Sequence, residues 1–185
     1  MDDTSEVAID PGDYFELTME ELREVARFAV QSAEEVLGMF EEATPGDPRP
    51  RAAIGAAWEF ANGARRTKLQ RATALDAHRA AKEAPSEAAK HAAHAAGDAA
   101  AAAYLHPFAK ADQVGHILRS AAHAARAAEL LAGGDPLAGP ELVGRAAARA
   151  TPGLVDVLRR YPPAPTGKSR VAALMSLLDD TLRRR

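Results

Sequence analysis

The sequence has 185 residues, of which 23 are Lys or Arg and 26 are Asp or Glu, and it contains no cysteine. This length can bury a genuine hydrophobic core, and the lack of cysteine excludes disulfides, thiolate nucleophiles and cysteine-ligated zinc. Alanine makes up roughly a quarter of the chain, aromatic residues are only 5%, and β-branched residues form no alternating runs. Helix is therefore favoured almost everywhere. We expect an all-α fold, an antiparallel alanine-rich helical bundle with a C-terminal helical extension.

Charge is distributed unevenly along the chain. The first 50 residues hold 14 acidic residues and three arginines, a net charge of -11, so residues 51–185 carry +8 to give the total of -3. The basic residues are spread over several predicted helices with few aromatic residues between them, so nucleic acid is not an expected partner. The N-terminus is acidic, and no run of 18 apolar residues occurs. These features predict a cytoplasmic protein with no membrane partner.

We expect three parts along the chain: an acidic tail over 1–17, the helical bundle over 18–133, and an extension over 134–185 that packs on the bundle. The first helix begins after Thr18, which has capping-box spacing to Glu21. Apolar residues then follow at steps of three and four, as a buried helix face requires; they are Leu22, Ala26, Ala29, Ala33, Val36 and Phe40. TPGDPRP over 44–50 ends this helix, and a second over 51–61 stops at Asn62-Gly63.

Three more helices are predicted for the bundle, over 65–82, 86–105 and 108–131. Pro85 and Pro107 separate them, and Gly133-Gly134 ends the last one. In the extension, short helices are expected over 140–150 and 152–160. A final helix over 169–184 has an apolar stripe that must be covered to avoid exposure; the stripe consists of Val171, Leu174, Leu177, Leu178 and Leu182.

The fourth predicted helix carries His91, His94 and Asp98 at positions i, i+3 and i+7. This spacing aims three side chains in one direction, which a zinc site requires. However, no Glu-x-x-His or His-Glu-x-x-His element is present to complete a ligand shell. We therefore expect no metal and no cofactor, and we interpret these residues as a polar face at the surface or rim of the bundle. A small-molecule or metal-binding helical domain remains the alternative.

The third predicted helix begins with four basic residues: Arg65, Arg66, Lys68 and Arg71. Helix N-termini favour acidic groups, so a compensating negative charge is expected. It can come from the glutamates of the first helix, from a partner protein or from phosphate. The sequence has no Gly-x-Ser-x-Gly elbow and no P-loop, so we do not expect an enzyme.

The segment EEVLGMFEEATPGDPRPRAAIGAAWEFANG over 34–63 resembles the front of the Imm5-like immunity proteins, helical proteins of bacterial polymorphic toxin systems. The similarity rests on Phe40-Glu41-Glu42, on the turn Asp47-Pro48-Arg49-Pro50-Arg51 and on Trp58 before Gly63. It continues through His78 and HAAHAAGDAAAAAYLHP, and covers about 22–132. The chain departs from the family in having Tyr104 where a histidine is usual, and the segment after Gly134 lies outside the family pattern.

The resemblance implies an immunity protein that neutralises a cognate bacterial toxin by stoichiometric binding. Because the front of the chain is acidic, we expect the toxin to present a basic surface. The expected contact residues are Glu34, Glu35, Glu41 and Glu42, with His91, His94 and Asp98 as the next surface. A helical regulatory interaction module is a further alternative, and a homo-oligomer stays open.

Overall fold

The computed structural model describes residues 14–185, and the fold over this range is all-α, as expected. Its α-helices are α1 Met19–Ala43, α2 Arg49–Ala61, α3 Lys68–Glu83, α4 Glu87–Ala101, α5 Val114–Leu131, α6 Ala138–Arg149, α7 Pro152–Arg159 and α8 Arg170–Arg183. Short 3-10 turns follow α4 at Ala102–Tyr104 and precede α5 at Ala111–Gln113. Most of the expected acidic tail, residues 1–13, lies outside the described residues. None of the described helices combines the length and apolarity that crossing a bilayer requires.

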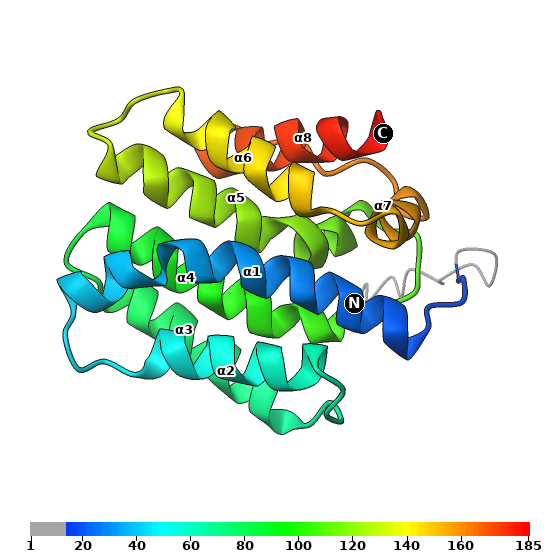
Figure 1. Ribbon diagram of the computed structural model, residues 1–185, viewed down its shortest axis with the longest axis horizontal. Coiled ribbons are helices and arrows are strands. Elements are labelled where there is room, and N and C mark those ends of the chain that lie inside the picture. Colours follow the sequence, from blue (N-terminus) through cyan, green and yellow to red (C-terminus); the bar gives the residue numbers. More distant parts are fainter. Residues whose placement is uncertain (1–13) are drawn as a thin grey trace, which may run out of the picture.

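The helix α4 occupies the centre of the bundle. It contacts α1, α2, α3 and α5, and Figure 1 shows α2 and α3 on one side of the α1 and α4 layer. On the other side lies α5, and α6 and α8 pack against α5. A helix surrounded in this way has little surface left for solvent. The arrangement therefore requires small side chains on most of α4.

Alanine meets this requirement because it lets helix backbones approach closely. Seven alanines of α4 are buried, and larger side chains from the neighbouring helices, including Phe40, Phe60, Ile117 and Leu118, complete the core. The expectation that the polar face of this helix lies at the surface is wrong for Asp98, which is 7% exposed. It is buried because α3 and α5 both cover the C-terminal half of α4.

Local capping signals fix where the helices begin. The capping box of Thr18 and Glu21 is present, and the whole predicted apolar face of α1 is buried. In contrast, α3 begins at Lys68 because Thr67 caps it, with the Gln70 side chain returning to the Thr67 amide. Arg65 and Arg66 therefore lie in the preceding loop, and the expected helix start at Arg65 is wrong.

The last helix, α8, packs its apolar side against α5 and α6. Leu174, Leu178 and Leu182 are buried as expected, but Leu177 is 39% exposed. Asp179 takes a buried position instead, because its carboxylate accepts from the Ala164 amide at 2.9 Å and from Arg183 at 2.8 Å. Satisfying these polar atoms sets the rotation of α8.

Leu178 and Leu177 provide a matched test of this rotation. Leu178→Ala should lower the free energy of unfolding by about 2 to 5 kcal/mol, because it leaves a cavity in the core. Leu177→Ala should cost less than about 1 kcal/mol, since its side chain already meets solvent. Urea unfolding of both variants checks this. Equal losses would show that α8 is docked differently or not at all.

Candidate functional site

The acidic edge, which we define as Glu34, Glu35, Glu41 and Glu42, lies along the C-terminal half of α1. Glu34 and Glu42 are exposed and have no ion pair among residues 14–185. Glu35 pairs with Arg145 at 3.1 Å and also with Arg149. Glu41 pairs with Arg51, whose guanidinium donates at 2.5 and 2.7 Å. Two of the four predicted contact residues are therefore free carboxylates, and two are engaged within the molecule.

Two hollows in the surface adjoin the acidic edge. One is lined by Gln31, Glu34, Glu35 and Arg149. The other lies at the turn after α1 and is lined by Glu41, Gly46, Asp47, Pro48 and Arg51. Each hollow thus has carboxylates in its wall. A protruding Lys or Arg side chain has the charge that such a wall attracts.

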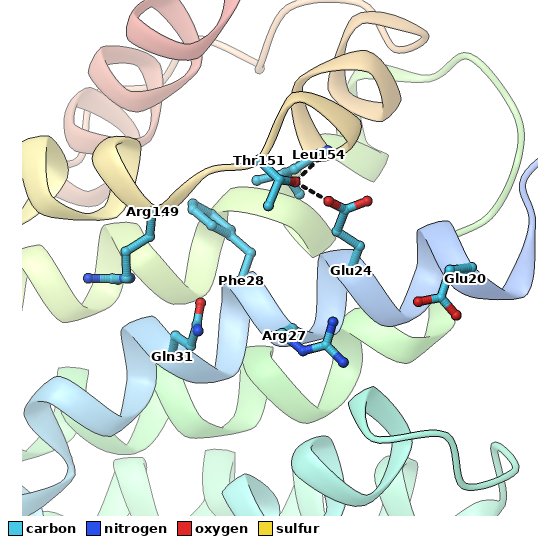
Figure 2. A pocket seen from close by; sticks show the side chains of 8 residues that line it. All are labelled: Glu20, Glu24, Arg27, Phe28, Gln31, Arg149, Thr151 and Leu154. Carbon is cyan, nitrogen blue, oxygen red and sulfur yellow. Dashed lines mark hydrogen bonds between the residues drawn. The ribbon is translucent and has the colours of Figure 1, made fainter.

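The N-terminal half of α1 is covered by the chain's own C-terminal segment. Figure 2 shows Glu24 pointing to Thr151, whose hydroxyl donates to it, in a cavity of about 260 Å³ between α1 and the start of α7. Glu21 receives the Arg160 guanidinium, and this hydrogen bond is the main reason that its pKa falls to about 2. The C-terminal segment thus engages Glu21 and Glu24, as it does Glu35 of the acidic edge, but not Glu34 and Glu42.

The basic residues before and within α3 do not pair with the glutamates of α1. Arg66 donates to the Ala103 carbonyl at 2.8 Å, and the guanidinium carbons of Arg66 and Arg71 lie 5.3 and 5.7 Å from the centre of the Tyr104 ring. The expected compensation by α1 is therefore wrong for both residues. It fails because the α1 carboxylates bind arginines of the C-terminal segment and Arg51 instead.

A second site, the histidine cluster, brings together residues from three helices: His78 of α3, His91, His94 and Asp98 of α4, and His123 of α5. The Nδ1 atoms of His78 and His94 are 2.9 Å apart, and those of His91 and His123 are 2.8 Å apart. Asp98 lies between the two pairs. Its Oδ1 is 3.6 Å from His78 Nε2 and its Oδ2 is 3.7 Å from His123 Nε2.

These contacts order the cluster as His94, His78, Asp98, His123 and His91. Within each imidazole pair, one Nδ1 must carry a proton and the other must accept it, so the accepting ring of each pair has to be neutral. Asp98 is less well satisfied, because its Oδ2 is buried and has no hydrogen-bond partner. The carboxyl group at the centre of the cluster therefore relies on the imidazoles of His78 and His123 for its polar contacts.

Burial controls the protonation of this cluster. It is the main cause that lowers the pKa of all four imidazoles, to about 4 for His94 and about 2 for His123. Burial also raises the pKa of Asp98 to about 7, against the smaller opposing effect of the Arg119 charge. A buried site disfavours every charged form, which explains both directions. At neutral pH the imidazoles are therefore held neutral, and the Asp98 carboxyl is close to its own pKa.

No three His, Asp or Glu side chains within residues 14–185 surround a common point that could hold a metal ion. The histidine cluster does not form such a metal site, because its Nδ1 atoms face each other in pairs. The structure does bring His91, His94 and Asp98 together, but as part of a larger group than the sequence indicated. His78 and His123 were missed as members because they lie on other helices, 16 and 32 residues from their partners.

Together, the all-α bundle and its charged surface define a helical protein with the exposed carboxylates Glu34 and Glu42 on the C-terminal half of α1. A family model described as "Imm-5 like putative immunity protein" matches residues 16–145. The chain therefore belongs to this family. The match reaches into α6, so the earlier expectation that the family pattern ends before Gly134 is wrong. Searches of curated proteins and of solved structures gave no significant match.

The histidine cluster predicts that acid destabilises the fold. The imidazoles have lower pKa values in the folded chain than the 6.5 of the unfolded chain, so below pH 6.5 the unfolded state binds more protons and stability falls. Asp98 has the opposite effect, because burial raises its pKa from the ordinary 3.8 to about 7, but it is one group against four imidazoles. We expect the free energy of unfolding to fall by at least about 1.4 kcal/mol between pH 7 and 5.5.

Urea unfolding over this pH range measures the effect. The variant His91→Gln with His94→Gln should show a shallower loss with acid, because two of the imidazoles are gone. Lys68→Gln, which removes an exposed charge at the start of α3, is the control and should keep the wild-type slope. Equal slopes for the double variant and the wild type would contradict this role for the cluster.

Gly97 is required by the histidine cluster for a steric reason. A Cβ at this position would lie 2.8 Å from both Cε1 and Nε2 of His78, which is too close for real atoms. Gly97→Ala should therefore displace His78 and cost about 1 to 3 kcal/mol. Gly55→Ala, in an open part of α2, should instead gain up to about 1 kcal/mol from helix propensity. Thermal melts compare the two, and a Gly97→Ala protein as stable as Gly55→Ala would contradict the packing.

Proposed function

We propose that this protein neutralises a cognate bacterial toxin by stoichiometric, non-catalytic binding, and that the acidic edge contacts a basic surface of the toxin. Membership of the Imm-5 like family over residues 16–145 supports the immunity role. The observation that carries the choice of surface is the pair of exposed carboxylates, Glu34 and Glu42, which have no ion-pair partner within residues 14–185.

Charge and shape both favour this edge for a protein partner. Complementary charge accelerates association and makes it sensitive to salt. The two hollows beside Glu35 and Glu41 can each receive a long cationic side chain. Glu35 and Glu41 already hold arginines of this chain, so arginines of a toxin would compete for or share these carboxylates.

The experiment uses the toxin encoded next to this protein. Glu34→Lys with Glu42→Lys should slow association at least about tenfold without unfolding the protein, because neither residue has an internal partner to lose. Association rates at several salt concentrations provide the measurement, together with survival of cells that express the toxin. Circular dichroism confirms that the variant is folded.

Two further variants sharpen the result. Glu59→Lys reverses an exposed charge on α2, away from the acidic edge, and should bind at the wild-type rate. Glu35→Lys should impair binding and also cost some stability, because it leaves Arg145 and Arg149 without their carboxylate. Unchanged association by the Glu34 and Glu42 double variant would overturn the proposed surface. If cells that express the toxin survive although the two proteins form no complex, the binding mechanism is overturned.

A further inference from the structure

A cavity of about 280 Å³ opens where α3 passes the end of α4 and the start of α5. Its polar lining consists of Arg71, His78, Tyr104, His106 and His116, and its apolar lining consists of Ala74, Leu75 and Ala101. No carboxylate lines the cavity. Leu75 is 53% exposed at its rim, so an apolar surface borders the opening of the cavity.

The electrostatic field around this cavity is positive. Arg71 has no ion-pair partner among residues 14–185, and Arg66 lies beside it over the same Tyr104 ring. Arg119 adds a third charge close enough to lower the pKa of both His78 and His116, after the larger effect of burial. The acidic groups nearby are Asp112, which acts on His116 more weakly than Arg119, and Asp98 behind His78.

Like charges gathered without a counter-ion are unfavourable, so this group of cations needs negative charge from elsewhere. The glutamates of α1 form no ion pair with these cations; Glu21, Glu35 and Glu41 bind Arg160, Arg145, Arg149 and Arg51 instead. Arg71 is also placed in the first turn of α3, where the helix dipole itself favours an anion. The cavity has room for a group of only a few atoms beyond the anion itself.

We infer that this cavity binds a small organic anion, a phosphate ester or a carboxylate, beside Arg71. A guanidinium donates two parallel hydrogen bonds to either oxyanion. The imidazole of His106, which also lines the cavity, offers a further donor. The carbon part of the ligand then covers Leu75 and Ala74, which would account for the exposed leucine.

Isothermal titration of the full chain tests this site with three probes: inorganic phosphate, glucose 6-phosphate and citrate, each against sodium chloride of equal ionic strength. The expected result is saturable one-to-one binding of at least one probe. Preference for glucose 6-phosphate over citrate identifies a phosphate ester, and the reverse identifies a carboxylate. Enzymes bind their ordinary metabolites with constants of about 1 mM or tighter. Absence of saturable binding by all three probes at about 10 mM would therefore overturn the site.

Matched variants locate the binding. Arg71→Gln should weaken it about tenfold or more, as expected for a lost charge-assisted hydrogen bond. Arg79→Gln removes a guanidinium from the same helix that is already paired with Asp76 at 2.7 Å, and it should bind as the wild type does. Leu75→Glu places a carboxylate at the exposed rim and should abolish binding while the fold survives. Equal weakening by Arg71→Gln and Arg79→Gln would show nonspecific ion binding and overturn the proposal.

Discussion

Close packing around α4 is the constraint on which the rest of this structure depends. Four helices contact α4, and only a chain of alanines with one glycine lets them approach so closely. Alanine buries less apolar area than leucine, so the helix itself contributes modestly to stability. The larger core residues, such as Phe40 and Phe60, come from α1 and α2. Large side chains on the helices around α4 therefore stabilise the bundle, and the small side chains of α4 let these helices lie close together.

The same packing explains the histidine cluster. Polar residues on α4 would meet solvent if the helix lay at the surface, but α3 and α5 bury Asp98 and cover His91 and His94 in part. Asp98 and the two imidazole pairs then have only each other as partners. A buried polar group without a partner costs free energy of folding. The relative positions of α3, α4 and α5 therefore depend on which members of the cluster carry a proton. Gly97 leaves the space that His78 needs to join it.

Electrostatics divides the surface of α1 into a structural part and a free part. Arg160 and Thr151 of the C-terminal segment bind Glu21 and Glu24, and Arg145 and Arg149 reach Glu35. The C-terminal segment thus neutralises part of the acidic charge of the first 50 residues. Within residues 14–185, Glu34 and Glu42 of the acidic edge stay without an ion pair, and so do Arg66 and Arg71, which lie over the Tyr104 ring.

Local patterns predicted the helices well because capping and apolar spacing act over a few residues. Thr18 and Glu21 place the start of α1 correctly, and the α1 face from Leu22 to Phe40 is buried as its spacing indicates. Leu177 and Asp98 were placed wrongly, because the rotation and burial of a helix depend on neighbours far away in the sequence. The histidine cluster was only half predicted for the same reason, since His78 and His123 meet α4 through tertiary packing.

The nitrogen NMR spectrum of the histidine side chains is the most direct test that α4 is the buried centre of the fold. If the account is correct, His78, His91, His94 and His123 stay neutral at pH 6, because burial lowers the pKa of each ring. Each Nδ1 pair should contain one protonated and one unprotonated nitrogen. Imidazolium signals from these four rings at pH 6 would contradict the account, since they would show that solvent reaches the polar side of α4.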